Sequence, residues 1–122
     1  MQLVTIRVIG VVTALVVPLF MTAVQVQSQT QAAMNAEAHA DFVKADAELN
    51  KTYEALLKNL PDAESKEKLK QSQRAWLAFR DAEAAFAADE ARGGSMAPTL
   101  RYASMTELTE QRTKQLKARL TD

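Results

Sequence analysis

Between residues 32 and 97, glycine and proline interrupt this 122-residue chain at only two places, and this scarcity constrains its fold more than any other feature. Neither residue occurs from about Ala32 to Leu60. Apolar side chains recur there every three or four positions, at Phe42, Ala45, Leu49, Tyr53, Leu56 and Leu60. This spacing places one apolar stripe along a helix. The segment therefore predicts a long helix with one buried face.

The first break is Pro61-Asp62. Proline biases the residue before it away from the helical conformation, yet it is accepted in the first turn of the next helix. Asp62, Glu64 and Glu67 suit a helix start, because carboxylates are favoured at the positive end of the helix dipole. We expect this second helix to run to about Ala91.

The second break is the loop Arg92, Gly93, Gly94, Ser95 and Met96. Glycine tolerates the left-handed conformation that ends many helices, and arginine suits a last turn. Ser95 is the expected cap of a third helix, which has Pro98 in its first turn and ends near Arg119. That helix carries an apolar stripe of Met105, Leu108, Leu116 and Leu120. Three helices joined by short breaks predict an all-α, antiparallel three-helix bundle.

The first 28 residues have the layout of a secretory signal peptide. Arg7 is their only charge, an apolar run spans residues 8–21, and small and polar residues follow. Cleavage is expected between Ala23 and Gln29, with Ser28 as a small residue before the cut. Residues 1–28 are then a signal peptide and residues 29–122 one helical domain, which predicts a periplasmic or secreted bacterial protein.

An uncleaved membrane anchor is the alternative for the same segment. Residues 3–26 approach the ~20 residues that a spanning helix needs. Pro18 and the lack of basic residues after the apolar run argue against it. We therefore expect no membrane attachment after cleavage.

The charge balance argues against a nucleic-acid partner. All 15 acidic residues follow residue 28, with 14 basic ones, which gives that part a net charge of −1. Binding to nucleic acid normally requires clustered excess lysine and arginine. The chain also has no cysteine, so it has neither a lipid-anchored cysteine nor a disulfide, and its stability must come from packing.

Several polar residues lie within the predicted apolar faces. With Trp76 as the zero of a helical wheel, Arg80 falls at about +40°, Gln73 at about +60° and Glu83 at about −20°. Arg112 falls about 40° from Leu108 in the third helix. In the first helix, Asp46 and Asn50 flank the stripe of Leu49 and Tyr53.

These positions predict a polar layer inside the bundle, because a buried arginine without an acceptor costs several kcal/mol. We expect Arg80 to pair with Asp46, and Arg112 to pair with Glu83 or Asp46. Asn50 and Gln73 would satisfy the remaining donors. The alternative is that both arginines lie along apolar neighbours on their aliphatic stems and reach water.

No set of residues suited to catalysis or to a cofactor is evident. His39 is the only histidine, too few for a metal site or for a base beside a nucleophile. The glycine pair lacks the lysine of a phosphate-binding loop. We therefore expect no catalytic, cofactor-binding or metal-binding residues. Trp76 is expected in the core with Leu49, Tyr53, Leu108 and Leu116, although a tryptophan can also anchor an interface.

Four motifs in order resemble the LprI-like lysozyme-inhibitor family. They are ADAELNKTYEALL (45–57), KLKQSQRAWLAFRDAEAAF (68–86), GGSMAP (93–98) and LTEQRTKQL (108–116). The positions that match its pattern are Leu49, Asn50, Tyr53, Gln73, Trp76, Arg80, Asp81, Gly94, Arg112 and Leu116. The resemblance implies a small exported helical protein of bacteria, whose founding type inhibits lysozyme.

The sequence departs from that family at its cysteines. The family pattern places them where this chain has Glu37, Ala84 and Ser104, with one more near the mature N-terminus. Loss of a disulfide removes on the order of 2–4 kcal/mol if nothing compensates. Alanine-rich packing of the first two helices is the expected compensation.

We therefore expect a binding protein and not an enzyme. If lysozyme is the protein partner, the exposed loop from Arg92 to Met96 is the candidate contact with the acidic cleft of that enzyme. The alternative is an envelope interaction or stress protein with a different protein partner.

Overall fold

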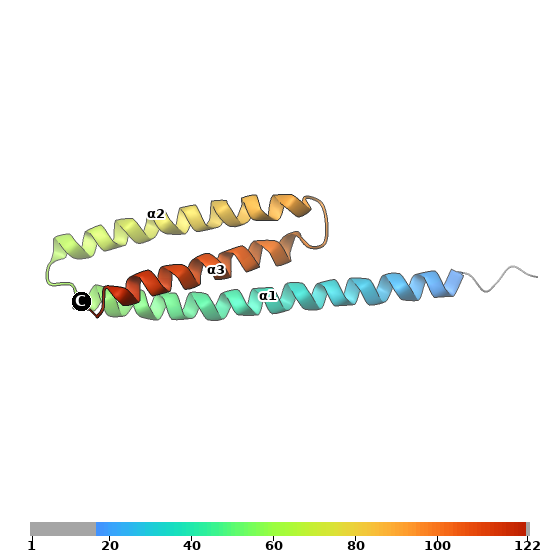
Figure 1. Cartoon of the computed structure of the whole chain (residues 1–122), viewed down its shortest axis with the longest axis horizontal. Coiled ribbons are helices and arrows are strands. Elements are labelled where there is room, and N and C mark those ends of the chain that lie inside the picture. The colour runs from blue at the N-terminus through green and yellow to red at the C-terminus, as the bar shows by residue number, and fades with distance from the viewer. Residues whose placement is uncertain (1–16, 122) are drawn as a thin grey trace, which may run out of the picture. The chain divides into compact units, whose positions relative to one another are not determined.

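A computed structural model describes residues 17–121 as three α-helices (Figure 1). They are α1 (Val17–Asn59), α2 (Ala63–Ala88) and α3 (Ala97–Ala118), with a short 3-10 helix, η1 (Asp89–Ala91), after α2. No strand occurs within these residues, so the all-α expectation is confirmed. None of the helices in this range combines the length and the apolar character of a membrane span.

The chain divides into two units, residues 1–30 and residues 31–122. The described part of the first unit is the beginning of α1, where the Thr30 hydroxyl donates to the Val26 carbonyl at 2.9 Å. The expected signal peptide, residues 1–28, lies outside the described residues for its first 16 positions.

α1 begins well before the expected residue 32. Its only proline, Pro18, stands in the first turn, where a missing N–H costs nothing. No glycine or further proline follows before Asn59, so nothing in the backbone stops the helix. The expected start was placed by the apolar stripe, which begins later than the helix does.

Asp62 caps α2, as its sequence position suggests. Its carboxylate accepts from the Ser65 backbone N–H at 2.7 Å and from the Ser65 hydroxyl at 3.2 Å. These hydrogen bonds lower the pKa of Asp62 because they favour its ionised form. The cap therefore starts α2 directly after Pro61.

The loop between α2 and α3 differs from the prediction at Ser95. Met96, not Ser95, is the residue that precedes α3, and no side chain caps this helix. The Ser95 carbonyl instead accepts from the Asn35 side-chain amide of α1 at 3.3 Å. Pro98 does stand in the first turn of α3, where one N–H would have had no helical partner.

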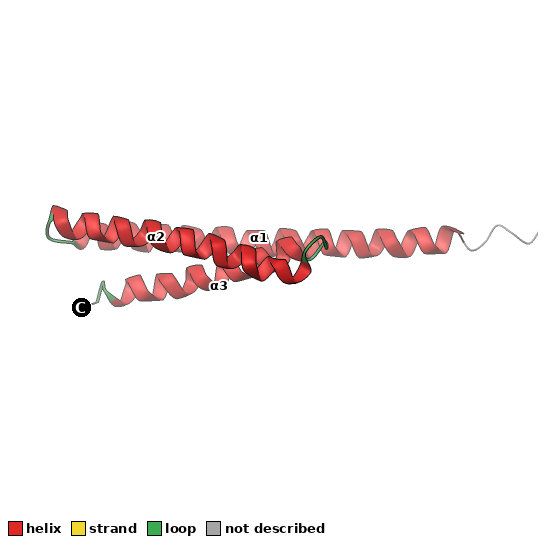
Figure 2. Cartoon of the chain, turned by 90° about the horizontal axis from the view of Figure 1, so that it is seen from above, coloured by secondary structure: helices red, strands yellow, loops and turns green. Residues whose placement is uncertain are grey.

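Within residues 31–121, α2 runs antiparallel to both α1 and α3, so α1 and α3 are parallel (Figures 1 and 2). The core is a cluster of leucines from all three helices: Leu49, Leu56, Leu69 and Leu116. Tyr53, Trp76 and Leu120 are among the half-buried side chains that pack against it. The antiparallel three-helix bundle is thus present in this unit.

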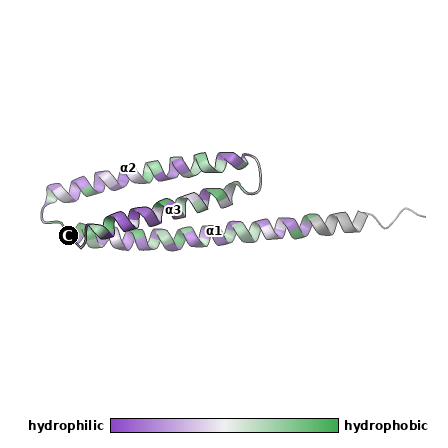
Figure 3. Cartoon of the chain, viewed as in Figure 1, coloured by the Kyte–Doolittle hydropathy of each residue, from purple (hydrophilic) through white to green (hydrophobic). Residues whose placement is uncertain are grey.

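The core is thin toward the loop between α2 and α3. Hydrophilic and hydrophobic residues are interspersed along α2, α3 and the coloured part of α1 (Figure 3), and the buried face of α2 consists of Leu69, Gln73, Arg80 and Ala84. Phe79 and Phe86, which lie in the apolar arc of the helical wheel, are 52% and 73% exposed. The inward face of α2 is therefore rotated toward its polar residues and away from its phenylalanines.

Candidate functional site

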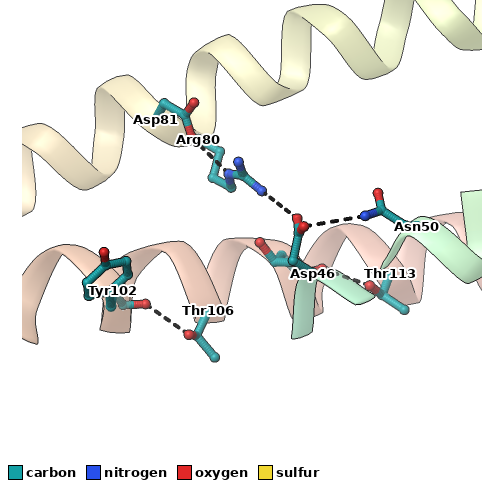
Figure 4. Close-up of polar contacts among 8 residues, drawn as sticks. Asp46, Asn50, Arg80, Asp81, Tyr102, Thr106 and Thr113 are labelled. Carbon is teal, nitrogen blue, oxygen red and sulfur yellow. Dashed lines mark hydrogen bonds and ion pairs between the residues drawn. The ribbon is translucent and has the colours of Figure 1, made fainter. Parts of the chain in front are cut away.

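Arg80 is the first of two inward-facing arginines. Its side chain is 8% exposed. Nη1 donates to Asp46 Oδ1 of α1 at 3.1 Å, and Nε donates to Asp81 Oδ1 at 3.0 Å (Figure 4). Two carboxylates thus offset the cost of removing a guanidinium from water. The structure brings Arg80 and Asp46 together across two helices.

Two aromatic rings complete the surroundings of this guanidinium. Cζ of Arg80 lies 5.2 Å from the ring centroid of Phe42 and 5.4 Å from that of Trp76. An aromatic face attracts a cation, and the contribution reaches about 2 kcal/mol where water is excluded. Trp76 therefore packs against the leucine core and also contacts the buried charge.

Asn50 lies at the outer edge of the same group. Its side-chain amide donates to Asp46 Oδ2 at 3.3 Å, so the Asp46 carboxylate accepts from two helices (Figure 4). Asn50 is exposed and Asp46 is half-buried. Asn50 and Asp46 therefore form the solvent-exposed edge of the polar layer.

Arg112 is buried between α3 and α2, but its partners differ from those expected. Nε donates to Gln73 Oε1 at 3.1 Å, Nη2 to Ser72 Oγ at 3.0 Å, and Nη1 to Gln115 Oε1 at 3.2 Å. Cζ also lies 5.8 Å from the Trp76 ring centroid. Three neutral oxygens thus take the place of the expected carboxylate.

Burial lowers the pKa of Arg112, and the nearby charge of Arg119 lowers it further. The guanidinium keeps its charge, because arginine is not deprotonated in proteins. Arg112 is therefore a buried cation that is held by hydrogen bonds and an aromatic face, with no ion pair to any residue from 17 to 121.

The expected pairing of Arg112 with Glu83 or Asp46 is wrong. Antiparallel packing places Gln73 opposite Arg112. Glu83 lies ten residues further along α2, a rise of about 15 Å. Glu83 is exposed, and no ion pair joins it to any residue in the described range. It does not belong to the polar layer.

The expected core residues separate into two groups. Leu49 and Leu116 are fully buried, and Tyr53 and Trp76 pack against the leucine cluster. Leu108 is half-buried and lies outside that cluster. The buried face of α3 instead includes two threonines: Thr109 is fully buried and Thr113 is 6% exposed.

The loop from Arg92 to Met96 is exposed at every residue. Gly93 adopts a φ of 75°, the left-handed conformation that glycine favours. Arg92 does not offer a free guanidinium, because Nε and Nη2 donate to the two oxygens of Asp89 at 2.6 and 2.7 Å. This ion pair raises the pKa of Arg92.

A polar cluster that the sequence does not predict connects the loop to α1. Gln31 Nε2 donates to Asn35 Oδ1 and to Thr99 Oγ1, each at 3.3 Å, and the Thr99 hydroxyl donates to Asn35. The Asn35 side-chain amide also donates a hydrogen bond to the Ser95 carbonyl. Asparagine, glutamine and threonine are common on exposed helix faces, so only the three-dimensional register of α1 and α3 reveals the cluster.

His39 is exposed, and its ring centroid lies 4.8 Å from that of Tyr102. Within residues 17–121, no group of three or more histidines and carboxylates is placed to hold a metal ion.

Comparison with known proteins adds the family. The family model described as lysozyme inhibitor LprI matches residues 22–116. The chain belongs to this family. It is also 42% identical over 100 residues to an uncharacterised protein of Rhizobium meliloti, an alignment that covers 72% of each chain. No solved structure matches the chain.

This LprI-family chain holds its helices together without cysteine. Ala84, at one position where the resemblance implies a cysteine, is completely buried on the inward face of α2. Glu37 is exposed and Ser104 is half-buried. Interhelical polar contacts, including the ion pair from Lys117 Nζ to Glu48 Oε1 at 2.7 Å, connect the helices instead.

Proposed function

We propose that this protein is an exported inhibitor of lysozyme that acts by protein–protein contact and without catalysis. The observation that carries the proposal is the match of the LprI family model to residues 22–116. This range includes both buried arginines and the loop between α2 and α3. The R. meliloti relative is uncharacterised and adds no activity of its own.

The signal-like layout of residues 1–28 supports the export part of the proposal. Cleavage in this segment would deliver residues 29–122 to the periplasm or the medium. Lysozyme attacks the cell wall in that compartment, so an inhibitor has to reach it.

The loop from Arg92 to Met96 is the proposed contact with the enzyme. Lysozyme cleaves its substrate between two carboxyl groups in a cleft. A guanidinium forms bidentate hydrogen bonds with carboxylates. Arg92 already binds Asp89 in this way, so docking would exchange one carboxylate for another. The exchange costs little because the pair is exposed to solvent.

The anchoring of the loop favours such a contact. A short loop that is fixed before binding loses little conformational entropy when it docks. The hydrogen bond from Asn35 to the Ser95 carbonyl and that from the Gly94 N–H to the Ala91 carbonyl, at 2.8 Å, restrain the loop at Ser95 and Gly94. Met96, which is 44% exposed, adds apolar contact area in the same loop.

A turbidity assay with lysozyme and a bacterial cell suspension tests the proposal. The purified protein at micromolar excess should slow clearing of the suspension. Arg92→Ala should weaken inhibition about tenfold, a typical effect for an arginine in the centre of an interface. Asp89→Ala should retain or strengthen inhibition, because it frees the guanidinium.

Arg74→Ala is the matched control for this assay. Arg74 is also an exposed arginine with an acidic partner, Glu67 at 3.2 Å, but it lies in the first half of α2. This variant should inhibit as well as the parent. Unslowed clearing with the parent protein would remove the inhibitor proposal, and equal inhibition by Arg92→Ala would remove the loop from it.

A further inference from the structure

Phe79, Ala82, Glu83 and Phe86 form an exposed strip on α2, here called the phenylalanine ridge. Phe79 is 52% exposed and Phe86 is 73% exposed, and Ala82 and Glu83 are exposed as well. A buried phenylalanine removes 150–250 Å² from water, so exposure of two on one helix forgoes a large stabilising contribution. Exposed apolar groups that lie together indicate an interaction site.

Helix geometry places these four side chains together. Phe79 and Phe86 are seven residues apart, which is about two turns and a rise of about 10.5 Å. Glu83 follows Phe79 by four residues and precedes Phe86 by three, so it is a surface neighbour of both rings. Ala82 follows Phe79 by three residues and precedes Phe86 by four, and its side chain is only a methyl group. The ridge is thus two aromatic rings with a carboxylate and a small gap between them.

The charge on the ridge is available for a partner. No ion pair joins Glu83 to a residue in the described range, and the nearest basic residue along the helix, Arg80, is engaged by Asp46 and Asp81. Glu90 is also exposed and lies seven residues beyond Glu83. The ridge therefore presents negative charge beside apolar surface.

We propose that the phenylalanine ridge is a docking surface for a basic protein, which inserts an arginine or lysine side chain between the two rings. The cation would pair with Glu83, and its aliphatic stem would cover Ala82. Aromatic faces and a carboxylate both attract a cation, so the two contacts act together. This inference goes beyond inhibition of lysozyme, because it concerns another face and does not depend on the loop from Arg92 to Met96.

Two other occupants fit the ridge less well. A second copy of the chain that packed its own ridge here would bring a carboxylate and no cation, and like charges that meet across an interface cost several kcal/mol. The beginning of α1, residues 17–30, contains no lysine or arginine and supplies no cation. A basic partner satisfies both the apolar rings and the carboxylate.

An NMR titration of the full chain tests the ridge directly. The probe is a short peptide of alternating arginine and leucine, and the control peptide has glutamate in place of arginine. The basic peptide should give saturable shift changes centred on residues 79–86, and the acidic peptide should give none. Glu83→Gln should weaken binding about fivefold, the effect of losing one exposed ion pair.

Matched variants complete the test. Phe79→Ala with Phe86→Ala should also weaken binding, and these exposed positions leave the fold intact, which circular dichroism checks. Glu54→Gln removes another exposed carboxylate, on α1, and should leave binding unchanged. Equal binding by the parent and Glu83→Gln, shifts that map elsewhere, or no binding at millimolar peptide would overturn the proposal. Shifts at the ridge that depend only on protein concentration would assign it to a second copy and overturn it too.

Discussion

Arg80 Nη1 lies 3.1 Å from Asp46 Oδ1, although the two residues are 34 positions apart and belong to different helices. The ion pair joins α1 to α2 in a chain that has no disulfide. Arg80 is removed from water while Asp46 keeps 35% of its side chain exposed, so the pair adds little net stability, and we expect it chiefly to fix the register of the two helices. We therefore expect large effects when one partner is removed and small effects when both are replaced.

Replacement of Asp46 by alanine tests this pair. The change leaves the Arg80 guanidinium buried with Asp81 as its only remaining carboxylate. We expect the free energy of unfolding to fall by about 1–3 kcal/mol, because a buried charge keeps its cost of desolvation after it loses an acceptor. Urea unfolding at pH 7 measures the change.

Arg80→Met in the Asp46→Ala background is the second arm of that experiment. It removes the buried charge and should restore part of the lost stability, which gives a coupling free energy between the two sites. Lys117→Ala is the control, because Lys117 and Glu48 also join two helices but are about half exposed. Its melting temperature should change by no more than about two degrees. If Asp46→Ala and the double variant both melt within a degree of the parent, the pair has no role.

Gln73→Leu tests the second buried arginine. Leucine is close to glutamine in size, but it cannot accept a hydrogen bond, so Arg112 loses the acceptor of its Nε. We expect a loss of about 1–3 kcal/mol, the cost of an unsatisfied buried donor beside a charge. Gln71→Leu, at an exposed position two residues away, should cost little. Equal unfolding curves for these two variants would show that the hydrogen bond from Arg112 to Gln73 is dispensable.

The helices and the position of Arg80 follow from the sequence because both depend on local periodicity. The spacing of Leu49, Tyr53 and Leu56 defines the inward face of α1, and Asp46 lies beside that face. The partner of Arg112 does not follow in this way. The partner depends on the axial position of α3 relative to α2. An apolar stripe does not determine this position, because it fixes only which face of each helix is inward.

The orientation of α2 is a second feature that periodicity left open. Phe79 and Phe86 are large and apolar, so a helical wheel places the predicted inward face of α2 close to them. The observed face contains Gln73, Arg80 and the small Ala84, because these side chains find partners on α1 and α3 or let the helices approach closely. Glu83 was assigned to the interior for the same reason.

Acid should weaken the start of α2. Hydrogen bonds from Ser65 lower the pKa of Asp62 in the folded state, so the cap contributes stability above the ordinary aspartate pKa of about 3.9. This contribution is lost as the pH falls through the lower folded pKa. Asp62→Ala should therefore lower the melting temperature by a few degrees at pH 7 and by much less at pH 2. Asp41→Ala, in the middle of α1, is the control and should show no such loss at pH 7.

Gly93→Ala should destabilise the loop between α2 and α3. The φ of 75° at Gly93 costs an L-residue with a Cβ about 1–2 kcal/mol. No atom lies within 4 Å of a Cβ added there, so the cost comes from the backbone conformation alone. Gly93→Asn should cost less, because asparagine tolerates this conformation. Thermal unfolding compares the two variants, and equal melting temperatures for Gly93→Ala and the parent would contradict the assigned conformation.

Direct binding to lysozyme tests the central functional claim. Calorimetric titration of lysozyme into the purified protein should give a saturable signal with a stoichiometry near one, and Arg92→Ala should weaken it while Arg74→Ala leaves it unchanged. Heats of dilution alone, at concentrations up to about 100 μM of each protein, would contradict an inhibitor that acts by protein–protein contact.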